Sequence, residues 1–153
     1  MSTPLKVLIV EDSEHKRERI VNFLRERIVD LKLSVAHSFN SACKRIDDFE
    51  FDLAIMDMSL PTYDKSTTES GGRFRVFGGH ELARKIVRKS IGCRIVFITQ
   101  FDSFSTKSDA HTLESLDKLL EKDCGKSYAG LIHYDSSKSS WKDELERSLR
   151  ISK

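Results

Sequence analysis

The chain has 153 residues, of which 39% are hydrophobic and 33% are charged, and its formal net charge is +2. This length suits one compact domain, and the composition is that of an ordinary globular protein. A net charge this small does not indicate binding to nucleic acid or to a membrane surface. The apolar runs fall short of the roughly 20 residues that cross a bilayer, and no leader peptide is expected at the N-terminus.

The three cysteines, Cys43, Cys93 and Cys124, lie far apart and form no Cys-x-x-Cys pair. Neither a zinc site nor a disulfide framework is therefore expected. Reduced thiols are typical of a cytoplasmic protein, which is the location that we predict.

Short apolar runs alternate with segments of helical spacing along the whole chain. A buried strand is predicted at 6–10, and Ser13 is the expected N-cap of the helix that follows. In chain order, the predicted elements are a strand at 6–10, a helix at 13–29, a strand at 33–37, a helix at 41–48, a strand at 53–56, a helix at 80–90, a strand at 94–98, a helix at 112–122, a strand at 129–134 and a helix at 140–149.

Five alternations of strand and helix predict an α/β fold, a doubly wound parallel sheet of five strands with helices on both faces. In such a sheet, ligands bind in a crevice at the carboxyl ends of the strands, near the point where the strand order reverses. The polar residues at these ends are therefore the candidate site.

Three of the predicted strands end in acidic or hydroxyl residues: Glu11 and Asp12 after the first, Asp57 after the third, and Thr99 at the end of the fourth. Clustered carboxylates repel one another unless a cation neutralises them, and Mg²⁺ suits a few carboxylates with water and phosphate oxygens. A carboxylate beside Mg²⁺ can act as a nucleophile toward phosphorus. A hydroxyl such as that of Thr99 can donate to a phosphoryl oxygen.

The segments VLIVED ending at Asp12, LAIMDMSLP around Asp57 and IVFIT ending at Thr99 occur in this order, each at a strand end. Together they resemble the receiver domains of bacterial response regulators, the CheY-like proteins of two-component signalling. The resemblance covers nearly the whole of 1–153 and implies the flavodoxin-like strand order 2-1-3-4-5. Pro61 matches the proline of the loop after the phosphorylated residue.

The resemblance also implies a role for each matching residue. Asp57 would accept a phosphoryl group from a histidine kinase or a phosphotransfer partner. Asp12 and Asp57, with Glu11 acting through water, would hold Mg²⁺, and the backbone carbonyl of Ser59 would complete the metal shell. Thr99 would be the hydroxyl that moves toward the phosphoryl group.

The chain departs from the family at the end of the fifth strand, where receivers normally carry a lysine followed by a proline. His133 or Tyr134 stands at that position, and Asp135 follows. A protonated His133 could supply part of the missing charge, although its side chain could equally face the core. Tyr134 could donate a hydrogen bond but brings no charge.

A second departure is the long inserted loop at about 62–78, after which Gly79 matches the glycine that opens the family's third helix. The alternating segment around Arg73 and Arg75 could form a short strand, a flap over the site or a docking surface. Either arginine could also reach in to replace the missing lysine, but a solvated loop is the alternative that we favour. The segment at about 100–128 is enlarged as well and could mark a partner surface.

The leading hypothesis is a stand-alone receiver that accepts a phosphoryl group on Asp57 and signals by binding another protein. It is not expected to be an enzyme beyond self-catalysed phosphorylation and dephosphorylation. A downstream protein is an expected partner, a homodimer is left open, and DNA binding is not indicated. A degenerate receiver that acts without phosphorylation is the main alternative. A phosphatase of the haloacid dehalogenase type ranks lower, because Ser59 stands where its second acid is needed.

Overall fold

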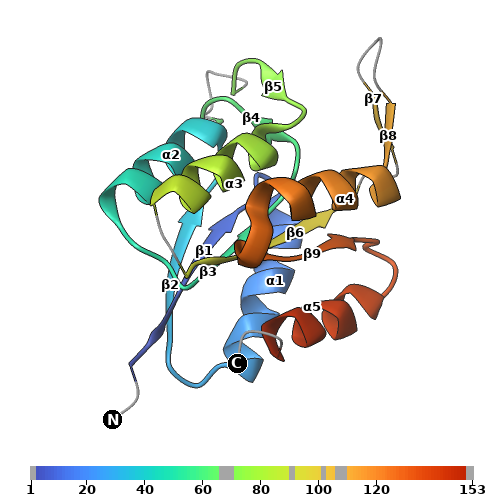
Figure 1. Cartoon of the computed structure of the whole chain (residues 1–153). Coiled ribbons are helices and arrows are strands. Elements are labelled where there is room, and N and C mark those ends of the chain that lie inside the picture. The colour runs from blue at the N-terminus through green and yellow to red at the C-terminus, as the bar shows by residue number, and fades with distance from the viewer. Residues whose placement is uncertain (1–2, 66–70, 90–91, 101–102, 106–109, 151–153) are drawn as a thin grey trace.

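The computed structural model describes residues 3–65, 71–89, 92–100, 103–105 and 110–150 (Figure 1). In chain order the elements are β1 (Leu5–Val10), α1 (Glu14–Arg27), β2 (Leu31–Ala36), α2 (Phe39–Asp48), β3 (Leu53–Met56), β4 (Leu60–Pro61), β5 (Phe74–Arg75), α3 (Gly78–Lys89), β6 (Arg94–Thr99), β7 (Ser103–Ser105), β8 (Ala110–Thr112), α4 (Leu113–Cys124), a 3₁₀ turn (Gly125–Ser127), β9 (Tyr128–His133) and α5 (Ser140–Arg150).

Five parallel strands form the main sheet, in the order β2-β1-β3-β6-β9. The short strands β4 with β5, and β7 with β8, pair as separate antiparallel hairpins outside this sheet. The five parallel strands therefore follow the predicted order 2-1-3-4-5, and the predicted fold class is confirmed. Each predicted helix and strand of the main sheet is present within a few residues of its expected bounds.

Helices cover the sheet on both faces, with α1 and α5 on one and α2, α3 and α4 on the other (Figure 1). Successive residues of each strand point to opposite faces. In β1, Leu8 and Val10 pack under α2, α3 and α4, whereas Val7 and Ile9 pack against α1 and α5. Both faces are thus apolar, which is why these strands read as continuous hydrophobic runs.

Helix α1 begins as predicted, with the side chain of Ser13 accepting a hydrogen bond from the backbone N–H of Lys16. Its buried residues are Lys16, Ile20, Phe23 and Leu24. Lys16, Ile20 and Leu24 are spaced four residues apart, so they share one side of the helix and face the sheet. Lys16 is therefore placed on the apolar side of an otherwise ordinary amphipathic helix.

The inserted loop contains β5, which pairs with β4 just before the loop. The short strand considered for the Arg73–Arg75 segment is therefore present at Phe74–Arg75. Residues 66–70 lie outside the described part of the chain. In the enlarged segment at 100–128, the described residues form the β7–β8 hairpin, α4 and the 3₁₀ turn. Among the described residues, none of the helices has the length and apolar character needed to span a membrane.

Candidate functional site

The carboxyl ends of β1 and β3 lie side by side and bring the acidic residues together. Val10 pairs with Met56, so Glu11 and Asp57 follow at the same level of the sheet, and the Asp57 N–H donates to the Val10 carbonyl at 3.1 Å. The alternation that directs Ile9 and Ile55 toward α1 and α5 continues by one more pair. It directs the side chains of Glu11 and Asp57 toward α1.

The carboxylates of Glu11, Asp12 and Asp57 form a compact cluster, in which one oxygen of each lies within 4.8 Å of the others. These side chains line a cavity together with Ser59, Thr99 and other residues of the strand ends: Ser13, Phe74 and Gln100. The structure therefore brings together the five residues that sequence analysis assigned to the metal and phosphoryl site.

Asp57 is one of the two partly exposed members of this cluster, with 15% of its side chain accessible, and Asp12 is the other, with 18%. Its Oδ1 accepts a hydrogen bond of 2.7 Å from the Met58 N–H. The backbone that follows is held against the start of α3, because the Gly79 N–H donates to the Met58 carbonyl at 2.8 Å. A Cβ on Gly79 would come within 2.3 Å of the Asp57 carbonyl oxygen, so only glycine allows this approach without a shift of backbone.

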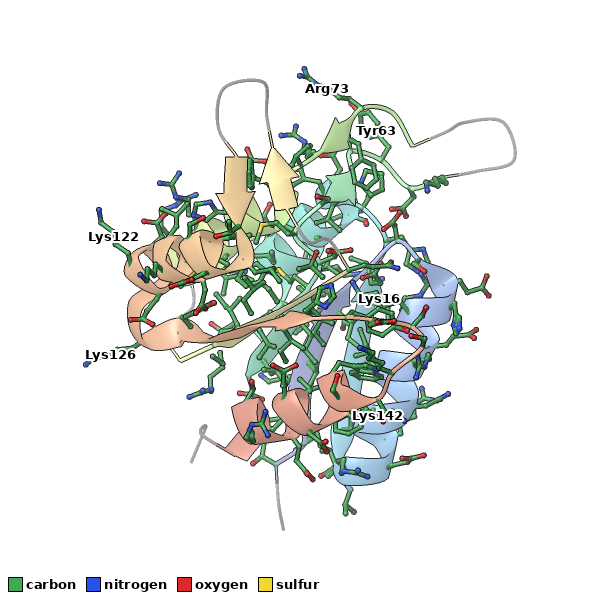
Figure 2. All side chains as sticks on the ribbon, turned by 90° about the vertical axis from the view of Figure 1, so that its right-hand side faces the viewer. Lys16, Tyr63, Arg73, Lys122, Lys126 and Lys142 are labelled. Carbon is green, nitrogen blue, oxygen red and sulfur yellow. The ribbon has the colours of Figure 1, made fainter. Side chains whose placement is uncertain are left out.

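Lys16 enters the cluster from α1, and sequence analysis did not anticipate it. Its ammonium lies 2.7 Å from Glu11 Oε1 and 3.2 Å from Asp57 Oδ2, and it donates to the Ile98 carbonyl at 2.6 Å. Only 2% of the Lys16 side chain is exposed. Figure 2 shows it inside the molecule between α1 and the sheet, whereas Lys122 and Lys126 project from the surface. Lysine is almost never buried this deeply unless its charge is paired, as it is here.

The combined effect of burial and neighbouring charges raises the pKa values of both Glu11 and Lys16. Burial raises the pKa of Glu11 to about 7; attraction to Lys16 opposes this shift and repulsion from Asp57 adds to it. Burial alone would lower the pKa of Lys16, but the carboxylates of Asp57 and Glu11 outweigh burial and raise it. Lys16 therefore stays a cation beside the acidic cluster.

Asp12 lies nearer to solvent and pairs with a different lysine. Its Oδ2 is 3.4 Å from the ammonium of Lys65, whose side chain is 56% exposed. Exposed pairs of this kind contribute little to stability and are readily exchanged for other cations. Asp12 can therefore exchange Lys65 for another cation. Glu11 and Asp57, in contrast, already share the buried ammonium of Lys16.

One feature of the sequence singles out Lys16 without showing whether it is buried. It stands four residues before Ile20 and eight before Leu24, at the head of the apolar stripe of α1. A charged residue on such a stripe is exposed if the end of the helix extends beyond the sheet. It is buried if the sheet carries an oppositely charged group opposite it. The spacing alone does not separate these two outcomes, because it carries no information on what lies opposite.

The end of β9, where receivers normally carry their lysine, is aromatic. Tyr134 is buried, and its ring lies 5.5 Å from that of Trp141. Its hydroxyl accepts a hydrogen bond of 2.8 Å from Arg19. The Lys16 ammonium stands 5.5 Å from the centre of the Tyr134 ring. His133 pairs with Thr99 across the sheet, and neither His133 nor Tyr134 lines the cavity around Asp57.

The two arginines of the inserted loop do not supply the missing charge. Arg75 pairs with Glu81 at 3.4 Å and lies over the ring of Phe39 at 4.1 Å. Arg73 projects from the outer end of the β4–β5 hairpin, near Tyr63 (Figure 2). The hypothesis that Arg73 or Arg75 reaches toward Asp57 is wrong for this structure. Phe74, between them, does line the cavity, so the hairpin partly covers the site.

Comparison with protein families agrees with this geometry. The model of the response regulator receiver domain matches residues 7–128, which is most of the chain. The chain therefore belongs to the receiver domain family. Receiver domains act in two-component signalling and are in general not enzymes.

A relative from Sinorhizobium fredii (strain NBRC 101917 / NGR234), described as the uncharacterized protein y4jR, is 27% identical over 94% of this chain and 96% of its own length. Among solved structures, the CheY-like receiver domain protein from Methanospirillum hungatei JF-1 matches with a TM-score of 0.64 at 17% identity, over 98% of this chain and 94% of that one. The non-phosphorylated HemR receiver domain from Leptospira biflexa matches with a TM-score of 0.62 at 21% identity, with the same coverage. These structures support the fold.

Proposed function

We propose that this chain accepts a phosphoryl group on Asp57, in a Mg²⁺-dependent reaction with a histidine kinase or phosphotransfer partner, and signals by protein–protein contact. The observation that carries the proposal is the cluster of Glu11, Asp12 and Asp57 at the strand ends, with Thr99 lining the same cavity. Membership of the receiver family supports the same chemistry.

The donor set fits Mg²⁺ rather than a softer metal. The three side chains offer carboxylate oxygens only, and Ser59 lines the same cavity. Mg²⁺ favours one or two carboxylates with waters and phosphate oxygens. Asp12 and Asp57 are the partly exposed members and would hold the ion directly, with Glu11 acting through water and the Ser59 carbonyl completing the shell.

When bound, Mg²⁺ would draw charge from the phosphoryl oxygens. The Asp57 carboxylate uses an oxygen lone pair to form the new bond to phosphorus, and the bond from phosphorus to the donor's leaving group breaks with its electron pair. The Met58 N–H fixes the orientation of the carboxylate through Oδ1. The buried hydroxyl of Thr99 donates to a phosphoryl oxygen in the product.

The surface beside the cavity suits a protein partner. Tyr63, Phe74 and Val76 of the β4–β5 hairpin are exposed by 55%, 49% and 37% respectively. Apolar side chains gathered next to a reactive group are typical of protein contact surfaces. The hairpin would thus contact the kinase, the phosphotransfer protein or the downstream target while Phe74 borders the reacting carboxylate.

The experiment is intact mass spectrometry after incubation with acetyl phosphate and Mg²⁺. The wild-type chain should gain the mass of one phosphoryl group, and the gain should disappear when EDTA removes the metal. Asp57→Asn should gain nothing, because an amide is not a nucleophile toward phosphorus. Asp48→Asn, a change at an exposed aspartate at the end of α2, is the matched control and should be labelled like wild type.

A degenerate receiver, which binds partners without phosphorylation, is the second candidate. It is favoured by Lys16, whose ammonium already forms ion pairs with Glu11 and Asp57 without a metal. The two functions can be distinguished by adding Mg²⁺ and beryllofluoride, which is a stable mimic of the phosphoryl group. Chemical shift changes around Asp57 and Thr99 support the phosphoacceptor, whereas an unchanged spectrum together with no acetyl phosphate labelling supports the degenerate receiver.

A further inference from the structure

We propose that Lys16, on α1, supplies to the phosphoryl group the positive charge that receivers normally obtain from the lysine at the end of their last parallel strand. This inference rests on the proposed phosphorylation of Asp57. It assigns to the site a residue that comes from a different element of the fold, a helix in place of the strand.

The first argument is distance. The Lys16 ammonium lies 3.2 Å from Oδ2 of Asp57, one of the two oxygens of the carboxylate that would carry phosphorus. Oxygens of a phosphoryl group attached to this carboxylate come within reach of the ammonium after small rotations of a four-carbon side chain. Within the described part of the chain, Lys16 is the cation that forms an ion pair with Asp57.

The second argument is charge. Phosphorylation converts the single negative charge of Asp57 into a group with more negative charge, in a cluster that already holds Glu11 and Asp12. One Mg²⁺ leaves negative charge in excess, and a buried ammonium reduces the remainder. In a site shielded from water, such a fixed charge stabilises the developing phosphoryl oxygens far more than an exposed lysine would.

The third argument is position. Lys16 is held by three contacts, of which the one to the Ile98 carbonyl comes from the strand that ends in Thr99. The ammonium is therefore anchored next to both the acceptor and the proposed phosphoryl-binding hydroxyl. When Asp57 is modified, the contacts to Glu11 and to Ile98 can keep Lys16 in place.

The fourth argument concerns the element that has lost its lysine. Tyr134 directly follows β9, and the centre of its buried ring lies 5.5 Å from the Lys16 ammonium. The two residues thus occupy neighbouring positions on the same face of the sheet. A second cation at Tyr134 would stand beside Lys16 and be repelled by it, so an aromatic ring there agrees with a charge delivered from α1.

The test compares Lys16→Met and Lys16→Arg with wild type, in rates of acetyl phosphate labelling at saturating Mg²⁺ and in Mg²⁺ affinity measured separately. Met retains the length of the side chain and removes the charge, whereas Arg retains the charge. If Lys16 stabilises the transferred group, Lys16→Met should lower the labelling rate on the order of 10²-fold, as loss of one preorganised donor does. Lys16→Arg should recover part of this rate.

Mg²⁺ affinity separates this role from a merely structural one. Removal of the competing ammonium should leave Mg²⁺ binding by Lys16→Met unchanged or tighter, while labelling falls. Lys118→Met, on an exposed surface of α4, is the control and should behave as wild type. If Lys16→Met is labelled at the wild-type rate at saturating Mg²⁺, the inference is overturned. It is also overturned if weaker Mg²⁺ binding accounts for the whole loss of rate.

A measurement on the unchanged chain covers the case in which the variants fail to fold. The ¹⁵N resonance of the Lys16 ammonium should shift when beryllofluoride and Mg²⁺ are added, because a new anion then stands beside it. An unshifted resonance with beryllofluoride bound at Asp57 contradicts a role for Lys16. If wild type is neither labelled nor perturbed, the phosphoacceptor function fails first, and the inference fails with it.

Discussion

The end of β9 and the start of α1 approach the acidic cluster from the same face of the sheet, yet they carry opposite kinds of side chain. Tyr134, the residue after β9, has an aromatic ring that packs on Trp141, whereas Lys16 brings a buried ammonium from the first turn of α1. In the receiver family the charge is expected from the strand. Here the strand contributes packing and the helix contributes the charge.

A charge can thus occupy the same region of space although a different element of the fold carries it. The Lys16 ammonium lies 3.2 Å from Asp57 Oδ2, and a long flexible lysine can reach such a position from a helix as well as from a strand. The end of β9 is then free to serve the core. The two regions should therefore respond differently to substitution. Changes beside β9 should mainly alter the free energy of unfolding, and changes at Lys16 should mainly alter the rate of acetyl phosphate labelling.

The largest stability effect is expected at Trp141, which fills the space between α5, β9 and α1. It is 1% exposed and lies 5.8 Å from Phe23 and 5.5 Å from Tyr134, ring to ring. Trp141→Ala should lower the free energy of unfolding by about 3–5 kcal/mol, because it removes apolar contact and leaves a cavity. Urea denaturation followed by circular dichroism measures this change.

Phe49→Ala is the matched control, since Phe49 is an aromatic residue that is 52% exposed. Its cost should stay within about 0.5 kcal/mol, as for most surface substitutions. Equal costs for Trp141→Ala and Phe49→Ala would show that the aromatic cluster does not stabilise the β9 side.

A smaller effect is expected from Gly79→Ala, which acts on the acceptor strand from the other face. The new methyl group would overlap the Asp57 carbonyl, and relief of this overlap should cost about 1–3 kcal/mol of stability. The labelling rate should fall as well, because Asp57 moves with its backbone. Denaturation and acetyl phosphate labelling, measured on the same preparation, check both effects.

The neighbouring glycine is a control for the change of residue type. A Cβ on Gly78 would meet Arg75 and Leu60 side chains at 3.3 and 3.4 Å, without the backbone overlap found at Gly79. Gly78→Ala should therefore cost less than Gly79→Ala. The reverse order would contradict the close approach of α3 to the loop after Asp57.

The smallest effect is expected from Tyr134→Phe, which keeps the ring and removes the hydroxyl that accepts from Arg19. The loss should be about 1 kcal/mol, the usual contribution of one hydrogen bond. Labelling should fall far less than in Lys16→Met, because Tyr134 lies outside the cavity. Tyr63→Phe, at an exposed tyrosine, is the control for stability; a larger loss of labelling for Tyr134→Phe than for Lys16→Met would reverse the comparison.

Much of the fold follows from local pattern. The strands at β1, β3 and β6 are apolar on both faces, and the helices repeat apolar residues every three or four positions, so their type and order can be predicted. Ser13 was correctly predicted as an N-cap for a local reason, since it acts within four residues. A short strand around Phe74–Arg75 was only one of several alternatives, and its pairing with Leu60–Pro61 was not predicted, because a long insertion carries no register of its own.

The order of residues is enough to identify the acids and the hydroxyl at the strand ends, since Glu11, Asp12, Asp57 and Thr99 each follow or close an apolar run. Parallel strands gather these ends at one edge, so their meeting requires no further information. The tertiary structure alone decided which cation joins them. Lys16 is buried beside Asp57 because α1 packs on the face toward which Glu11 and Asp57 point, and that packing depends on contacts between segments far apart in the chain.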